Sequence, residues 1–198
     1  MMRTLNVLLV VGVLALVAAP ALAEGGGILR GGVTYVLPGG DAKFKVAGEQ
    51  GSLEVDSSFG LYIGYEFMFN DLFGIDTSVA WQDHDYTAYV PGNDPNPIEG
   101  SVGNIPLEVA FNFHVLRGDW GTFYVGAIGG YNFAQDRANN SVGWGAQAGA
   151  DIKLTDSGLL LNMATSYMWI SQDWDLTSST ISYDINPWTF RFGLGYRF

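Results

Sequence analysis

Residues 187–198 read PWTFRFGLGYRF, and apolar and polar side chains alternate along this stretch without a break. One face would carry six large apolar or aromatic groups: Trp188, Phe190, Phe192, Leu194, Tyr196 and Phe198. The opposite face would carry Thr189, Arg191, Gly193, Gly195 and Arg197. A period of two predicts a β-strand, and a strand between lipid and a narrow polar lumen needs this division. The alternative is the edge strand of a soluble β-sandwich.

The same alternation recurs in seven other segments, each long enough for a tilted membrane strand. They cover residues 29–37, 59–69, 73–82, 105–115, 122–133, 142–154 and 159–170. Short connections (70–72, 116–121, 155–158) alternate with long ones (38–58, 83–104, 171–186), as periplasmic turns and external loops do, and the connection 134–141 is intermediate in length. The sequence therefore predicts an all-β fold, an eight-stranded antiparallel transmembrane up-and-down β-barrel with both termini in the periplasm. A soluble barrel of the lipocalin type has the same strand count but needs a polar outer face.

The N-terminus has the pattern of a secretory signal peptide. A positive charge at Arg3 precedes an apolar run, and Ala21-Leu22-Ala23 is a small-residue cleavage site. We expect residues 1–23 to be removed and residues 24–198 to form one barrel domain. The alternative is an uncleaved transmembrane anchor, since the run approaches spanning length.

Composition narrows the class further. The chain has no cysteine, which excludes disulfides and thiol chemistry, and its 27 glycines and 14% aromatic residues fit a crowded barrel with interfacial girdles. The formal net charge is −11, and removal of Arg3 with the signal peptide leaves eight basic against 20 acidic residues, or −12. We therefore expect no nucleic acid partner, because the basic footprint is missing.

Several motifs resemble the OmpW family of small outer-membrane barrels over nearly the whole length after residue 23. They are Leu29-Arg30-Gly31-Gly32-Val33 with Pro38, residues 65–69 with Asn70-Asp71 and Phe73-Gly74-Ile75, Asp83-His84-Asp85, Ile105-Pro106-Leu107, Tyr124-Val125-Gly126-Ala127, Gly143 with residues 147–151, and the closing residues 184–188 and 193–198. Asn186 departs from the family's usual Asp, and Pro106 is single where a proline pair is common. The resemblance implies an eight-stranded barrel that helps small hydrophobic molecules across the outer membrane.

The inward positions divide by height into two groups. The periplasmic half collects charged side chains that we expect to form a polar plug: Arg30, Glu66, Asp76, Glu108, His114, Asp151, Lys153, Arg191 and Arg197. Eight strands leave a lumen that side chains fill, and unpaired buried charges are costly, so these groups should pair. The extracellular half contributes an expected apolar vestibule: Val36, Ile128, Met168 and Ile170. The alternative is that these four are packing residues only.

The leading functional hypothesis is passage of small hydrophobic solutes, which would enter at the top, meet the plug and leave sideways into the bilayer. A non-transporting surface, adhesion or membrane-integrity barrel is the alternative. We expect no enzyme, cofactor or metal, because Asp83 and Asp85 would point away from His84 on an extended chain and no Ser-His-Asp spacing, phosphate loop or HExxH motif is present. The expected partners are outer-membrane lipid and lipopolysaccharide, the solutes, and assembly machinery that reads Tyr196 and Phe198.

Overall fold

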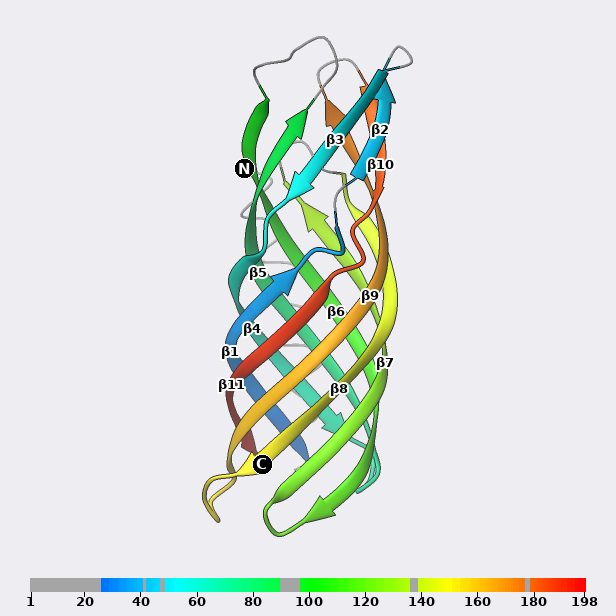
Figure 1. The fold of residues 1–198 in the computed structure, drawn as a ribbon. Coiled ribbons are helices and arrows are strands. Elements are labelled where there is room, and N and C mark those ends of the chain that lie inside the picture. Colours follow the sequence, from blue (N-terminus) through cyan, green and yellow to red (C-terminus); the bar gives the residue numbers. More distant parts are fainter. Residues whose placement is uncertain (1–25, 41, 47–48, 90–96, 136–138, 177–178) are drawn as a thin grey trace.

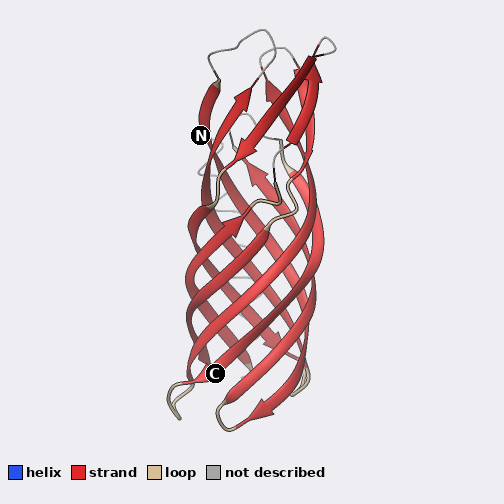
Figure 2. Cartoon of the chain, in the orientation of Figure 1, coloured by secondary structure: helices blue, strands red, loops and turns tan. Residues whose placement is uncertain are grey.

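The computed structural model describes residues 26–40, 42–46, 49–89, 97–135, 139–176 and 179–198. The expected signal peptide, residues 1–23, lies outside the described residues. Within these ranges the chain forms strands and their connections (Figure 2). No helix in the described part of the chain is long and apolar enough to cross a membrane.

Eight antiparallel strands close into a ring. They are β1 (Gly27–Leu37), β4 (Ser58–Met68), β5 (Phe73–Tyr89), β6 (Ile98–Gly118), β7 (Gly121–Ala134), β8 (Ser141–Lys153), β9 (Leu159–Leu176) and β11 (Trp188–Arg197). Each pairs with the next, and β11 pairs with β1 to complete the circle (Figure 1). The closed ring satisfies the backbone hydrogen bonds between neighbouring strands without leaving an edge in the lipid region. The prediction of an eight-stranded antiparallel barrel is confirmed.

Three further strands lie within the connections that the sequence predicts as long loops. They are β2 (Ala42–Val46), β3 (Glu49–Val55) and β10 (Ser179–Asp184), and β5, β6 and β9 also continue into these connections. β2 and β3 form a hairpin on β5, and β10 pairs with β9 (Figure 1). We call this tier the upper end and the end with the short turns the lower end. Above the membrane a strand needs no apolar outer face, so the alternation that marked the other strands is absent here.

A small apolar core holds the upper tier together. Leu53 of β3, Tyr86 and Ala88 of β5 and Val102 of β6 are buried against one another. The tier is therefore a packed extension of the barrel wall, and it can place side chains above the lumen at fixed positions.

The seam between β1 and β11 is closely packed. The ladder runs from Ile28 opposite Arg197 to Leu37 opposite Trp188, so the start of β1 and the end of β11 lie together at the lower end. Gly32 faces Gly193, and a Cβ atom on Gly193 would lie 2.3 Å from the carbonyl oxygen of Gly31. Glycine is needed at Gly193 because the neighbouring backbone leaves no room for a side chain.

The two faces of the wall have opposite character. Large apolar side chains cover the outside, with exposed examples on every barrel strand: Val33, Phe59, Leu61, Trp81, Val109, Phe111, Val125, Trp144, Met163, Phe190 and Phe192. Many buried inward positions are polar or charged. This arrangement reverses that of a water-soluble barrel and suits a wall surrounded by lipid.

Candidate functional site

A buried arginine on β1 organises the lower half of the lumen. The Arg30 guanidinium contacts Asp151 twice, with Nε 3.1 Å from Oδ1 and Nη2 2.6 Å from Oδ2. Its Nη1 lies 2.7 Å from Oδ2 of Asp76, and its Nη2 lies 2.5 Å from Oε2 of Glu66. One cation thus joins carboxylates from β4, β5 and β8 across the barrel, and all four side chains are buried. We call this network and the pair described below the polar floor.

Other buried side chains extend the contacts of these carboxylates. The Nε2 atom of His114 lies 3.0 Å from Oε1 of Glu66, and the Asn112 amide donates to the same oxygen at 2.8 Å. The Asn162 amide donates to Oδ1 of Asp151 at 2.8 Å. Both oxygens of Glu66 and of Asp151 therefore have partners, as buried carboxylates require.

A second ion pair lies beside the first network. Arg191 of β11 pairs with Oε2 of Glu108 on β6, and the Ser78 hydroxyl donates to the same oxygen at 3.4 Å. The Arg191 guanidinium also lies over the Tyr62 ring, 5.6 Å from its centre. The network and this pair together connect β1, β4, β5, β6, β8 and β11 across the lumen.

Two residues expected in the plug lie elsewhere. Lys153 is exposed near the lower rim and pairs with Asp156 of the following turn at 2.7 Å. Arg197 lines an open groove at the same rim and forms no ion pair among the described residues. Both residues continue the inward alternation of their strands, but at the strand ends the lumen opens to water. The other seven expected plug residues do meet in the floor.

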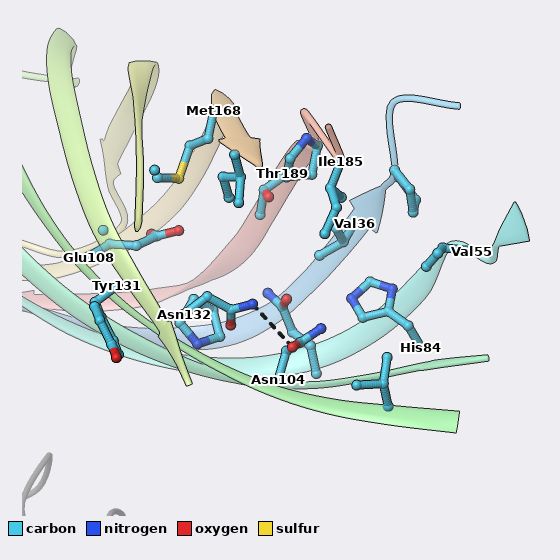
Figure 3. A pocket seen from close by; sticks show the side chains of 18 residues that line it. Val36, Val55, His84, Asn104, Glu108, Tyr131, Asn132, Met168, Ile185 and Thr189 are labelled. Carbon is cyan, nitrogen blue, oxygen red and sulfur yellow. Dashed lines mark hydrogen bonds between the residues drawn. The ribbon is translucent and has the colours of Figure 1, made fainter. Parts of the chain in front are cut away.

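A mostly apolar cavity lies above the floor and holds about 60 Å³ of space for the centres of water-sized molecules (Figure 3). Val36, Met168 and Ile170 line it, as the sequence analysis expected. Ile128, the fourth expected vestibule residue, does not line it and packs with Ala110 and Met168. The cavity therefore lies between the floor and the upper tier.

The upper tier supplies cavity residues beyond the four predicted from the sequence. They include Val55 of β3, His84 of β5, Val102 of β6 and Ile185, which follows β10. These positions lie in connections that the sequence predicts as long loops, in which the sequence does not indicate an inward or an outward face. A regular apolar alternation, the signal used for the other strands, is not present there.

His84 is buried beside the cavity, whereas Asp83 and Asp85 are exposed, as the extended backbone predicts. Its Nδ1 lies 3.0 Å from the carbonyl oxygen of Asp56, and its Nε2 lies 3.2 Å from the Ser58 hydroxyl. Because a carbonyl only accepts, Nδ1 donates there and Nε2 accepts from Ser58. Burial lowers the pKa of His84, which favours this neutral form. Its hydrogen bonds fix the β3–β4 connection to β5.

The wall beside the cavity has a break in its hydrogen-bond ladder. Between β5 and β6 the pairing stops after Val79 and Leu107 and resumes at Gln82 and Asn104. Pro106 lies in this interval, and a proline has no N–H to donate to a neighbouring strand. The register is the same on both sides of the interval, so the ladder is interrupted locally, beside the cavity.

A groove lies over this break on the outer surface of the barrel. It holds about 280 Å³ by the same measure, and Phe59, Trp81 and Ile105 are among its lining residues. Gln82 and Asn104 line both this groove and the inner cavity. These two residues therefore border both the inner cavity and the outer groove.

Comparison with known proteins identifies the family. Residues 7–198 match the family model described as the outer membrane protein beta-barrel domain. Outer membrane protein W of Vibrio cholerae is 32% identical over 213 residues, which cover 93% of this chain and 94% of that protein. The crystal structure of OprG from Pseudomonas aeruginosa has the same fold, with a TM-score of 0.75, 22% identity and coverage of 88% of this chain and 96% of that one. The solid-state NMR structure of outer membrane protein AlkL also matches, with a TM-score of 0.67, 16% identity and coverage of 88% and 90%. This chain belongs to the outer membrane protein W (OmpW) family of integral outer-membrane β-barrels.

Proposed function

We propose that this barrel assists the passage of small hydrophobic molecules across the outer membrane. A solute enters the apolar cavity at the upper end, is stopped by the polar floor and leaves sideways through the wall between β5 and β6. The observation that carries the proposal is that Gln82 and Asn104, beside the break in the ladder, line both the inner cavity and the outer groove.

The floor makes a straight axial path unfavourable. A solute that continued downward would have to separate Arg30 from its carboxylates, and breaking a buried ion pair costs roughly 3–5 kcal/mol. The wall at Pro106 has no such ion pairs among its described contacts. A solute that moves sideways between β5 and β6 therefore disrupts weaker interactions than one that moves down through the floor.

The size of the cavity sets a condition on entry. Its volume suffices for a few water molecules, because one water needs about 10–15 Å³ by this measure. A hydrocarbon chain therefore enters by displacing side chains. Met168 suits this role because its unbranched thioether chain adopts many shapes at small cost.

The proposed direction requires the upper end to face outward. The start of β1, the end of β11 and the short turns all lie at the lower end, which suits a periplasmic location after removal of residues 1–23. An epitope inserted at exposed Gly40 should bind antibody on intact cells, whereas one inserted between Asp156 and Ser157 should bind only after the outer membrane is opened. The opposite accessibility would reverse the orientation.

Charged substitutions in the cavity test the entry step. Met168→Asp and Ile170→Asp should reduce uptake of radiolabelled decane by intact cells, because burial penalises the new charge. Met168→Leu and Ile170→Val are the matched controls and should keep uptake near the parent's. Heat-modifiable migration on a gel checks that every variant assembles. If the Asp variants carried decane like the parent, the apolar path would be wrong and the surface or membrane-integrity role would replace it.

A reversible cross-link tests the lateral exit. The chain has no cysteine, so Trp81→Cys and Ile105→Cys together place a single pair of thiols across the break in the wall. Oxidation should lower decane uptake, and reduction should restore it. The control pair Thr165→Cys and Phe190→Cys lies across the intact β9–β11 ladder, where a cross-link should leave uptake unchanged. Unchanged uptake in the cross-linked Trp81/Ile105 variant would remove the lateral step.

A further inference from the structure

Neutral carboxamide side chains border the break between the inner cavity and the outer groove. Gln82, Asn104 and Asn132 line the cavity, and Gln82, Asn104 and Gln135 line the groove. The Asn132 amide donates to Oδ1 of Asn104 at 3.1 Å, and Figure 3 shows the two side chains meeting at the cavity wall. A wall made for hydrocarbon alone would gain nothing from four polar groups at its thinnest point.

One of these groups lacks a partner. The Oδ1 atom of Asn132 is buried and accepts no hydrogen bond from the described protein groups. A buried acceptor without a partner is costly, so a hydrogen-bond donor on a solute would be favoured beside it once the solute has displaced the side chains over it. A hydroxyl group is the simplest donor that also remains uncharged.

The charges around the route disfavour ionised head groups. Apart from His84, whose pKa is lowered by burial, Glu108 is the charged residue among those that line the cavity, and Arg191 already pairs with it. Asp83 is the charged residue among those that line the outer groove. An anionic head would meet a carboxylate on both sides of the wall, and a cationic head would find the inner carboxylate already paired. Either ion would also lose its hydration.

We infer that the preferred solutes are uncharged amphiphiles: an apolar chain that carries one neutral hydrogen-bond donor such as a hydroxyl. This inference rests on the proposed function and names the substrate class of the same site. The chain lies against Val36, Met168 and Ile170, while the head group pairs with Asn132 and then with the carboxamides beside the break. The carboxamides replace the water that the head group loses and hold no fixed charge that would trap it.

A set of three solutes with the same chain length tests this inference. Uptake of radiolabelled decan-1-ol, decane and decanoate is measured in intact cells at pH 7.5, where decanoate is ionised, and the uptake of cells that lack the barrel is subtracted. The barrel-dependent uptake should be largest for decanol, smaller for decane and least for decanoate. Decanoate uptake equal to that of decanol would overturn the inference.

Two substitutions test separately the hydrogen bond between the solute and Asn132 and the effect of the Asp83 charge on ionised solutes. Asn132→Leu has nearly the same shape and should lower decanol uptake about ten-fold, as expected for one lost hydrogen bond, while decane uptake stays at the parent's level. Asp83→Asn removes the charge at the outer groove and should raise decanoate uptake without changing that of decane. If Asn132→Leu reduced decane and decanol equally, the amide would be structural and the inference would fail.

Failure of this inference is distinguishable from failure of the proposed function. If none of the three solutes shows barrel-dependent uptake, both fail. If decane and decanol enter at the same rate and Asn132→Leu changes neither, transport stands and the preference for a donor is wrong.

A binding measurement tests the inference without transport. With the barrel in nanodiscs, decanol but not decane should shift the NMR resonance of the Asn132 side-chain amide. This resonance is assigned by its loss in Asn132→Leu. An unshifted resonance would also overturn the inference.

Discussion

Arg30 and Asp151 face each other across the lumen in a two-point contact, with Nε 3.1 Å from Oδ1 and Nη2 2.6 Å from Oδ2. The planar guanidinium matches the geometry of a carboxylate, which gives the contact both strength and a fixed orientation. The two residues come from β1 and β8 and are separated by 121 positions in the sequence. The contact links two strands that lie three places apart in the ring, and it belongs to the network at the centre of the polar floor.

Removing the central cation should destabilise the barrel strongly. Arg30→Met leaves Glu66, Asp76 and Asp151 buried without their cation, which should cost roughly 3–5 kcal/mol of unfolding free energy. Arg30→Lys should lose part of this energy, because an ammonium group cannot make the two-point contact. Urea unfolding of the purified barrel in lipid vesicles measures both changes. The matched control is Lys153→Met, which removes an exposed pair with Asp156 and should leave stability unchanged. A stable Arg30→Met barrel would show that the floor's ion pairs contribute little.

Charges on the outer face should be costly near the middle of the bilayer. Phe192→Arg or Ile63→Arg should each reduce the unfolding free energy by roughly 2–4 kcal/mol, because both side chains are exposed on the lipid-facing wall. Phe192→Leu and Ile63→Leu keep an apolar side chain and serve as controls. The same vesicle unfolding assay applies. If arginine were tolerated as well as leucine, the outer face would not contact lipid.

The barrel strands could be predicted from the sequence because each has lipid on one side and a crowded lumen on the other. Phe192 faces the lipid and is apolar, whereas Arg191 faces the lumen and is charged. The alternation therefore assigns each residue of a strand to one of the two faces. The upper tier has no such constraint, so Val55 and Val102 gave no recognisable pattern although both line the cavity. Their positions depend on the pairing of β3 with β5, which sequence alone does not specify.

The partners within the floor could not be predicted individually. The sequence placed Arg30, Glu66, Asp76 and Asp151 on the inward face, but their heights depend on the stagger between strands around the ring. The same limit explains why Lys153 is exposed although it was expected in the plug. The alternation of β8 continues to the lower rim, where an inward position is open to water. Periodicity thus identifies the face of a residue more securely than its level in the barrel.

Loss of the last residue should impair assembly. The Phe198 amide donates to the Gly27 carbonyl at 3.1 Å, and its ring packs edge-on against Tyr196 with centres 5.0 Å apart. Deleting Phe198 removes a hydrogen bond of the closing seam and one end of the aromatic row that we expect the assembly machinery to read. Heat-modifiable migration and outer-membrane fractionation should show less folded protein. Leu72→Ala, in an exposed turn at the same end, is the control and should assemble normally. Normal assembly without Phe198 would make its role incidental.

Acid should loosen the upper tier through His84. Because burial lowers the pKa of His84, the unfolded chain binds more protons at this position than the folded protein as the pH approaches 6.5, the ordinary histidine value. The stability that neutral His84 contributes is therefore fully present above about pH 6.5 and is lost as the pH falls below it. Asp83 and Asp85 raise the pKa in part, but desolvation is the larger effect.

His84→Gln keeps a hydrogen-bonding side chain that does not titrate, so it should flatten this dependence. Amide hydrogen exchange of residues 52–58 and 84–89 at pH 8 and pH 5 measures the opening of this region. Equal acid sensitivity in the parent and in His84→Gln would assign the effect to other groups.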